Sequence, residues 1–256
     1  MRNIQQKVSV IMPCHNEAER IVHNIEETIR TFDEFRCPYE IIVIDDGSTD
    51  DTYEQVSKLK HHHKHIILNK NWENYGKGRA IKKGCRIASG DYIVFLDADM
   101  DLHPGQLQTF MDIMRLSDAD AVIGSKMHPN SVLKYPWDRK LISRVYFGLI
   151  KLLFGLPIHD TQTGLKVFKR EVIKKVLPRI LVKQFAFDLE ILANAHRLGF
   201  KIAEAPVVLN SQRKYCRIGL KAIYQTTWDT LAVFYRMHIL KYYDRIDYYR
   251  RKRAKR

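Results

Sequence analysis

The sequence predicts an α/β protein with a mostly parallel β-sheet flanked by helices. Short continuous apolar runs recur along the chain, and the first of them are followed by stretches whose apolar residues have helical spacing. Polar clusters also come directly after three of these runs. Strands that alternate with helices form parallel sheets through right-handed crossovers, and ligands bind at the carboxyl ends of such strands. We therefore expect the functional site where the three polar clusters meet.

The first half of the chain supplies the clearest strand and helix signals. Residues 8–12 form an apolar run, and Ile21, Ile25 and Ile29 then recur at helical spacing. Residues 41–44 form a second apolar run before a helix that extends to residue 59. The further expected elements are strands at 65–68, 92–96, 121–125 and 205–209, and helices at 77–88, 137–154 and 187–198, with a polar loop at 160–166.

The basic residues are concentrated at one end of the chain. The 256 residues carry a net charge of +14, and residues 211–256 hold 13 Lys and Arg against 3 Asp. We predict two parts: an α/β domain at 1–210, and a basic, aromatic segment at 211–256 that forms an amphipathic helix at a membrane surface. By composition alone the basic segment also suits nucleic acid or another acidic partner.

Two carboxylates follow the apolar run 92–96. Asp97 and Asp99 are two residues apart, and residues two apart in a strand point the same way. Paired carboxylate oxygens suit Mg²⁺ or Mn²⁺, which hold the phosphates of a substrate through one or two carboxylates. Asp101 repeats the spacing. Solvated loop residues or helix caps would show the same triplet, so the pattern alone leaves both interpretations open.

Four motifs in order give the chain a family resemblance. They are Val-Ile-Met-Pro-Cys-His-Asn-Glu at 10–17, Ile-Asp-Asp-Gly-Ser-Thr-Asp at 44–50, Asn-Tyr-Gly-Lys-Gly-Arg-Ala at 74–80 and Leu-Asp-Ala-Asp at 96–99. Together they resemble the family 2 glycosyltransferases, which have the GT-A fold with its Rossmann-like sheet, over residues 8–210. The motifs at 124–126, 159–166 and 185–190 resemble the branch that transfers sugar to polyprenyl phosphates, particularly the dolichyl-phosphate β-glucosyltransferases, with the dolichyl-phosphate mannosyltransferases as near relatives.

The resemblance implies a nucleotide-sugar donor lying across the strand ends. Pro13, Glu17 and Asp46 would line the pocket for the base and ribose, Asp45 would support them, and Lys77 would approach the donor. Turn chemistry after a strand is the competing explanation for the two aspartates. A solvated lysine at a helix start is the competing explanation for Lys77.

The resemblance also assigns the metal and the acceptor. Asp97 is expected beside the nucleotide, Asp99 on a Mg²⁺ or Mn²⁺ that bridges both phosphates, and Asp101 as a further metal ligand. The remaining expected site residues are Asp160 and Asp188 near the reacting groups, and Lys126, Arg139 and Arg213 on the acceptor phosphate. Ordinary surface charges explain the three cations equally well, and the dipole of a helix N-terminus explains Asp188.

The sequence hypothesis is therefore an inverting, metal-dependent transferase that moves a sugar from a nucleotide donor to dolichyl or another polyprenyl phosphate. UDP-glucose is the donor that the resemblance favours; GDP-mannose, UDP-N-acetylglucosamine and a soluble or cell-envelope glycan acceptor remain open. The four cysteines show no paired spacing, and no long apolar stretch precedes Val8. We expect a cytoplasmic protein bound peripherally to the cytoplasmic face of a membrane. A basic nucleic-acid-binding module is the alternative from another class, although carboxylates at the strand ends would repel a phosphate backbone.

Overall fold

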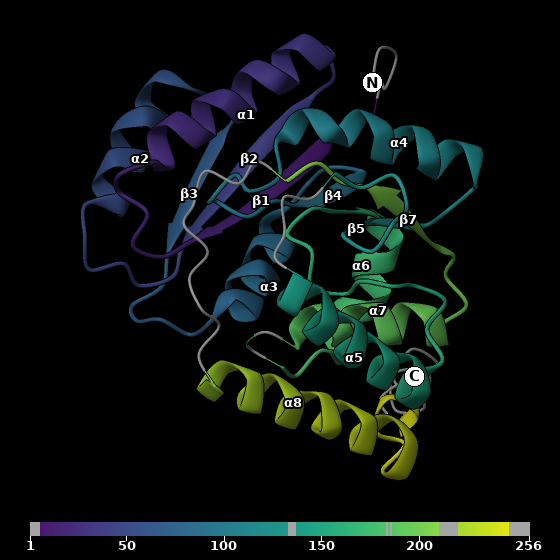
Figure 1. Cartoon of the computed structure of the whole chain (residues 1–256). Helices are drawn as coiled ribbons and strands as arrows, with labels where there is room; N and C mark the ends of the chain where they lie inside the picture. The colour runs from purple at the N-terminus through teal and green to yellow at the C-terminus, as the bar shows by residue number, and fades with distance from the viewer. Residues whose placement is uncertain (1–5, 133–136, 183, 185, 210–219, 246–256) are drawn as a thin grey trace, which may run out of the picture.

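The computed structural model describes residues 6–132, 137–182, 184, 186–209 and 220–245, with only the backbone for 137–145 and 220–223 (Figure 1). The strands are β1 (Val8–Cys14), β2 (Tyr39–Asp45), β3 (Ile66–Lys70), β4 (Tyr92–Phe95), β5 (Ala121–Ser125), β6 (Lys166–Lys169) and β7 (Ile202–Pro206). The helices are α1 (Ile21–Phe35), α2 (Thr52–His62), α3 (Lys77–Ile87), α4 (Leu107–Leu116), α5 (Trp137–Phe154), α6 (Arg170–Val176), α7 (Phe187–Arg197) and α8 (Leu220–Phe234).

The strands form one sheet in the order β3-β2-β1-β4-β6-β5-β7. β6 runs antiparallel to both of its neighbours, and the other pairs are parallel. The chain adds β2 and β3 on one side of β1 and then crosses to place β4 on the other side. Such a switch point opens a crevice at the carboxyl ends of the strands, where ligands of open α/β sheets bind.

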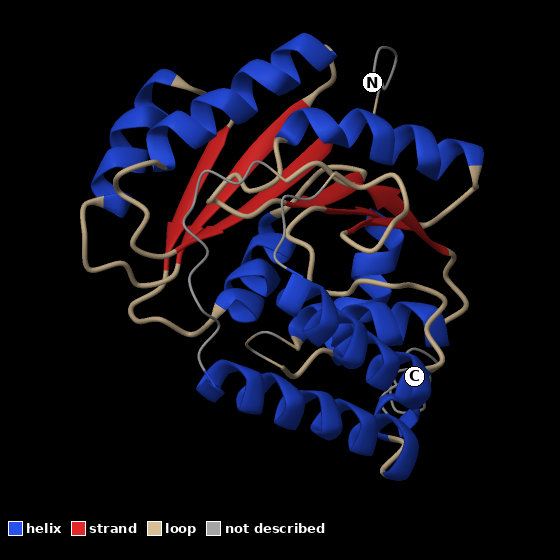
Figure 2. Ribbon diagram, viewed as in Figure 1, coloured by secondary structure: helices blue, strands red, loops and turns tan. Residues whose placement is uncertain are grey.

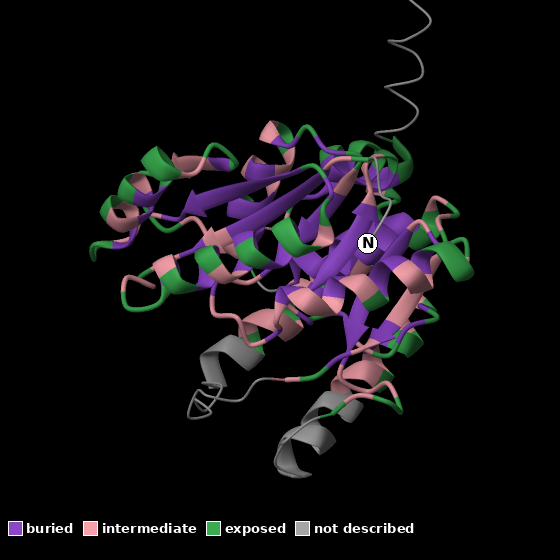
Figure 3. Cartoon of the chain, turned by 90° about the horizontal axis from the view of Figure 1, so that it is seen from above, coloured by how far each residue is buried: buried purple, intermediate pink, exposed green. Residues whose placement is uncertain are grey.

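Helices cover both faces of the sheet, so the molecule has three layers (Figure 2). One buried cluster joins α1, α2 and α4 to side chains such as Val10 of β1, and the other joins α3, α6 and α7 to side chains such as Ile11. Neighbouring residues of β1 thus enter opposite clusters, as the alternation of side chains along a strand requires. The central strands are buried on both faces (Figure 3), which explains their continuous apolar sequences.

The structure confirms the predicted α/β class and the mostly parallel sheet, but two sequence predictions about strands were wrong. The strand expected at 205–209 is β7, which begins earlier and ends at Pro206, because a proline has no N–H to continue the ladder. β6 was not predicted at all. It begins at Lys166, inside the expected polar loop, and lies between β4 and β5 in the middle of the sheet.

The C-terminal helix α8 packs against α5, on the side of α5 away from the sheet (Figure 1). Tyr146 of α5 shares a hydrogen bond of 3.0 Å with Thr230 of α8, and the rings of Phe154 and Phe234 meet edge to face. The segment that follows α8 reaches α7, where Tyr243 contacts Ala193. No helix in the described ranges has both the length and the apolar character that a bilayer crossing requires.

Candidate functional site

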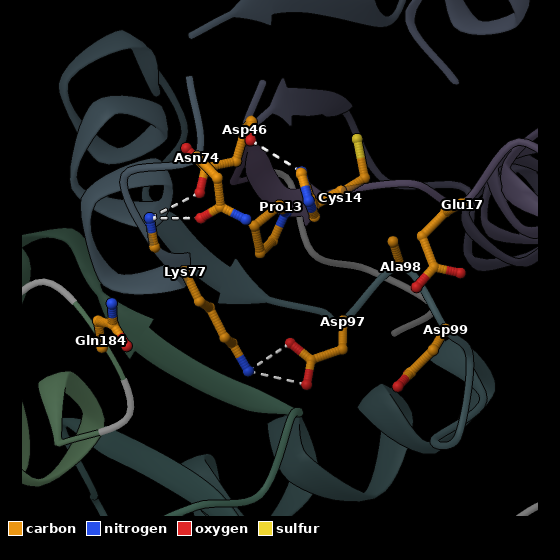
Figure 4. A pocket seen from close by; sticks show the side chains of 12 residues that line it. Pro13, Cys14, Glu17, Asp46, Asn74, Lys77, Asp97, Ala98, Asp99 and Gln184 are labelled. Atoms are coloured by element: carbon orange, nitrogen blue, oxygen red, sulfur yellow. Dashed lines mark hydrogen bonds and ion pairs between the residues drawn. The ribbon is translucent and has the colours of Figure 1, made fainter. Parts of the chain in front are cut away.

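A pocket of about 480 Å³ lies at the switch point between β1 and β4 (Figure 4). A volume of this size suits a small organic ligand. Its lining comes from the end of β1 and the residues after it, the residues after β2 and β4, the loop before α3 with the first residue of that helix, and the loop before α7. The lining residues are Pro13, Cys14, His15, Glu17, Asp46, Asn74, Gly76, Lys77, Asp97, Ala98, Asp99 and Gln184. The three polar strand ends therefore meet, as the sequence predicted. Among the predicted site residues the pocket brings together Pro13, Glu17, Asp46, Lys77, Asp97 and Asp99.

Asp46 organises the loop that leads into α3. Its carboxylate accepts hydrogen bonds from the side-chain amide of Asn71 at 2.7 Å and from the N–H groups of Tyr75 at 3.2 Å and Gly76 at 2.8 Å. The main-chain N–H of Asp46 donates to the carbonyl of Cys14, which ties β2 to the end of β1. Asp46 thus lines the pocket and also fixes the wall that continues into Lys77.

Gly47 lets this loop lie against the end of β2. Its φ angle is +70°, a conformation that L side chains rarely adopt. A methyl group at this position would stand 2.6 Å from the Cα atom of Glu73 and 2.7 Å from the nitrogen of Asn74. Since both atoms belong to the backbone, only glycine allows the loop to approach so closely. The glycine of the Asp-Asp-Gly-Ser motif therefore shapes the pocket wall.

Lys77 and Asp97 form an ion pair inside the pocket. The Nζ atom of Lys77 lies 2.6 Å from Oδ1 and 2.8 Å from Oδ2 of Asp97 (Figure 4). Burial disfavours the charged amine, but the carboxylates of Asp97, Asp188 and Asp99 outweigh it and raise the pKa of Lys77 above its usual value. The lysine is therefore a permanent cation at neutral pH, held by its position at the first residue of α3.

Asp97 is confined from its other side by Gly164. A methyl group on Gly164 would stand 2.8 Å from the carboxyl carbon of Asp97, well inside van der Waals contact. The loop that carries Gly164 leads into β6, where Lys166 forms a buried ion pair of 2.9 Å with Asp188 and also donates to the carbonyl of Thr163. Asp188 is thus committed to Lys166 and does not line the pocket.

The predicted set of three metal-ligating aspartates is not assembled in the structure. No group of three or more His, Cys, Asp or Glu side chains among the described residues is arranged to hold a metal ion. β4 ends at Phe95, and the carbonyl of Asp97 accepts a hydrogen bond from Met100, whose φ angle of +56° turns the chain. The strand alternation on which the spacing argument for Asp101 rests has ended by then, so the role of Asp101 as a metal ligand stays a prediction from the family resemblance. Asp101 does not line the pocket.

The charge of the pocket nevertheless fits a divalent cation. Among the described residues, four carboxylates line it, from Glu17, Asp46, Asp97 and Asp99, against the single amine of Lys77. An anionic diphosphate would be repelled by this lining unless a cation balanced it. Mg²⁺ is usually held by one or two carboxylates together with substrate phosphates and waters, so no complete protein cage is needed. Asp97 and Asp99 provide such a pair.

Asp45, Asp160 and Lys126 are not among the residues that line this pocket. Asp160 accepts hydrogen bonds from the N–H groups of Lys126 at 3.1 Å and Gln162 at 2.9 Å, so it joins its loop to the end of β5. Asp45 is fully buried and accepts from the N–H of Ser48 at 3.2 Å. Lys126 is partly exposed just after β5. The side chain of Arg139, on α5, and the whole of Arg213 lie outside the described residues.

Several lining residues were not predicted. Asn74 and Gly76 belong to the recognised glycine motif, which was the signal that would have identified them. Gln184 precedes α7 and reaches the pocket only through tertiary packing, for which the sequence carries no local signal. Burial, together with the neighbouring carboxylates of Asp45 and Glu17, raises the pKa of the Cys14 thiol, so Cys14 is a neutral wall residue and not a nucleophile.

Comparison with known proteins identifies the family to which this fold and pocket belong. The family model described as glycosyl transferase family 2 matches residues 9–177. The chain belongs to this family.

Curated relatives cover most of the chain. Glycosyltransferase AglD of Haloferax volcanii is 32% identical over 203 residues, which are 78% of this chain and 32% of AglD. A dolichyl-phosphate beta-glucosyltransferase of Dictyostelium discoideum is 33% identical over 213 residues, 78% of this chain and 65% of that protein. The enzyme of the same description, ALG5A, from Trichomonas vaginalis is 32% identical over 248 residues, 93% of this chain and 76% of that protein. The chain thus spans less than two thirds of the first two relatives.

Solved structures share the fold. The glucosyl-3-phosphoglycerate synthase of Mycobacterium tuberculosis superposes with a TM-score of 0.67 at 19% identity, over 90% of this chain and 80% of that one. Its complex with Mn²⁺, UDP and glucosyl-3-phosphoglycerate gives a TM-score of 0.66 at 20% identity, over 90% and 79%. At this identity the likeness establishes the GT-A-like architecture.

Proposed function

We propose that the protein is a metal-dependent, inverting glycosyltransferase that moves glucose from UDP-glucose to dolichyl or another polyprenyl phosphate. The observation that carries the proposal is the pocket at the β1–β4 switch point, with its excess of carboxylates around one lysine. Similarity to dolichyl-phosphate beta-glucosyltransferases over as much as 94% of the chain supports the acceptor and the sugar.

The donor would lie across the carboxyl ends of β1, β2 and β4. Pro13, Glu17 and Gln184 all line the pocket, and Asp46 holds the loop that carries the lining residue Gly76. A pocket of about 480 Å³ is large enough for a substantial part of a nucleoside diphosphate sugar. Support for a uridine nucleotide and for Mn²⁺ or Mg²⁺ comes from the fold neighbours, which were crystallised with UDP and these ions.

The chain's own residues would act by positioning and by charge. Mg²⁺ or Mn²⁺, held by Asp97 and Asp99, would supply neutralisation of the charge that develops on the departing diphosphate. Asp97 holds the ammonium of Lys77 in the pocket. This cation would also face the phosphates of the donor, and the side chain would not have to rearrange when the donor binds. A phosphate acceptor is already an anion, so the site needs no strong general base. Asp160 and Asp188 are engaged by protein donors, which suits positioning roles in the acceptor half of the site.

A lipid-linked acceptor would bring the protein to the cytoplasmic face of a membrane. The cytoplasmic leaflet is anionic, and residues 211–256 hold 13 Lys and Arg against 3 Asp. Lys126, Arg139 and Arg213 stay proposed as acceptor-phosphate ligands on the family resemblance.

The test is transfer of labelled sugar in detergent to dolichyl phosphate. The donors are UDP-glucose, UDP-N-acetylglucosamine and GDP-mannose, each with Mg²⁺, with Mn²⁺ and with a chelator. We expect a lipid-linked product from UDP-glucose that the chelator abolishes. Product from another donor would replace glucose in the proposal. Nucleotide-sugar binding without lipid product, but with transfer to a soluble acceptor, would refute the lipid acceptor.

A further inference from the structure

An apolar stripe runs along the outer face of α8 and of the π-helical turn Tyr235–Ile239 that follows it. Tyr224, Trp228, Leu231, Tyr235 and Ile239 are all exposed, from 44% for Leu231 to 70% for Tyr224. Their spacing of four, three, four and four residues places them on one face of a helix. At 1.5 Å per residue the part of the stripe from Tyr224 to the end of α8 at Phe234 is about 15 Å long. None of its five side chains is charged, whereas an exposed helix face is normally polar.

The inner face of the same helix is already occupied. Thr230, Val233 and Met237 are buried, and Thr230 is hydrogen-bonded to Tyr146 of α5. Beyond α8, the side chain of Tyr243 donates to the buried carboxylate of Glu190 on α7. The C-terminal half of α8 and the segment after it are therefore packed against α5 and α7, and the outer stripe faces away from these contacts. The helix cannot turn inward to bury these side chains.

The composition of the stripe and of its flanks matches the interface of a bilayer. Tyr and Trp rings prefer the headgroup region, and Leu and Ile prefer the boundary with the acyl chains. Lys241 and Arg245 are exposed just beyond the end of the stripe. They belong to the segment 211–256, whose net charge is +10. Such a charge is attracted to anionic lipid headgroups, and it would repel a second copy of the same surface across a two-fold axis.

We infer that α8 and the π-helical turn after it lie flat on the surface of a bilayer that contains anionic lipids, with Tyr224, Trp228, Leu231, Tyr235 and Ile239 inserted into the headgroup region. This inference deepens the proposed function and rests on it in one respect, since a polyprenyl phosphate acceptor resides in such a bilayer. The stripe assigns the contact to one face of one helix, and the basic segment supplies the charge that selects anionic lipid.

The experiment is flotation of the full chain with vesicles of phosphatidylcholine, alone or mixed with phosphatidylserine. Wild-type protein should float with the mixed vesicles, and added salt should weaken the binding. The double variant Trp228→Ser, Tyr235→Ser removes two rings from the stripe. It should lower the ratio of bound to free protein about tenfold or more. Leu231→Ser should lower it severalfold.

Leu116 offers a matched control for Leu231. It is 89% exposed at the end of α4, on the opposite side of the sheet from the layer that carries α8. Leu116→Ser should float as the wild type does, although it removes a more exposed leucine. Every variant should keep its transfer rate in detergent, which also shows that each one folds. Wild-type protein that does not float, or stripe variants that float normally, would overturn the inference.

Two further outcomes separate this inference from others. Light scattering could instead show that the wild type is a dimer and that Trp228→Ser is a monomer. This result would identify the stripe as a contact between two copies of the chain and would reject the bilayer contact. If the protein forms the lipid-linked product in detergent but does not float with vesicles, the inferred membrane contact is rejected and the proposed transferase function is retained. Flotation that depends on the stripe, without any lipid-linked product, would reject the proposed transferase and retain the membrane face.

Discussion

Replacing Gly164 with alanine tests whether the position of Asp97 controls activity. The added methyl group would stand 2.8 Å from the carboxyl carbon of Asp97, whereas ordinary contact begins at 3.4 Å. The carboxylate must therefore move by about 0.6 Å or more, against the hold of Lys77, whose amine contacts both of its oxygens. A displacement of about 1 Å in a catalytic group costs roughly a hundredfold in rate. We expect the transfer rate of Gly164→Ala to fall about ten- to a hundredfold.

The stability of this variant should change little. Gly164 does not have a positive φ angle, so alanine can adopt its backbone conformation. Gly-to-Ala changes at such positions alter the free energy of unfolding by about 1 kcal/mol or less. The assay is the initial rate of glucosyl transfer in detergent at several UDP-glucose concentrations, beside a thermal unfolding curve. Loss of rate with an unchanged melting temperature is the expected combination.

Gly148→Ala is the matched control. A methyl group on Gly148 meets no atom within 4 Å, and within helix α5 the change should be neutral or slightly stabilising. Full activity in Gly164→Ala, with the melting temperature of the wild type, would refute the argument that this glycine confines Asp97. Loss of activity that accompanies a large loss of stability would attribute the effect to folding instead.

The remaining predictions concern the metal pair, a buried ion pair and pH. Asp99→Asn should lower the rate of sugar transfer about a hundredfold or more while the protein stays folded, because it removes a carboxylate from the proposed cation site. Transfer rates measured across a Mn²⁺ titration check this prediction. Lys166→Met leaves Asp188 buried without its partner and should cost about 3–5 kcal/mol of unfolding free energy, and adding Asp188→Leu should recover much of it in denaturant unfolding. Burial opposes ionisation of Glu40, but hydrogen bonds from Lys7, Ser9 and Ser89 lower its pKa below its usual value of 4.5. Its contribution to stability is therefore full above pH 4.5 and is lost as the pH falls through the lower folded value; melting curves of Glu40→Gln should show a weaker acid dependence.

Each of these predictions has an opposing result. Wild-type rates in Asp99→Asn with a chelator present would remove the metal from the mechanism. A double variant at positions 166 and 188 that is no more stable than Lys166→Met would show that the pair does not act as a unit. An acid unfolding profile that Glu40→Gln leaves unchanged would show that other carboxylates dominate at low pH.

Local sequence predicted most of the sheet because buried parallel strands have distinctive apolar runs and their carboxyl ends share one edge. β1, β2 and β4 were found in this way, and with them the pocket. β6 was not, because its sequence Lys-Val-Phe-Lys begins with a charged residue. Lys166 is buried there only because Asp188, distant in the chain, supplies its counter-charge. A partner of this kind is visible only in the folded protein.

The dependence on tertiary structure also explains what the sequence did not show about the site. The metal prediction extended the alternation of β4 as far as Asp101, although the chain turns after Asp97. The sequence offered no local signal for Gln184, which reaches the pocket from the loop before α7. The family motifs correctly selected Asp46, Lys77 and Asp97 as lining residues. They did not show that each of these side chains is held by a protein partner.

Those partners change what the acidic residues do. Asp46 accepts three hydrogen bonds from the loop before α3, Asp97 holds Lys77, and Asp160 accepts two main-chain N–H groups. Carboxylates bound in this way are in place before a donor arrives, so little binding free energy is lost in ordering them. Their substitution should therefore affect both stability and donor affinity. Asp99 is held in a similar way, because its carboxylate accepts a hydrogen bond from the main-chain N–H of Asp101 at 3.2 Å. Asparagine keeps an oxygen that can accept this bond but loses the charge. Asp99→Asn should therefore lower the rate with little change in stability, and that combination would separate the effect of charge from the effect of the hydrogen bond.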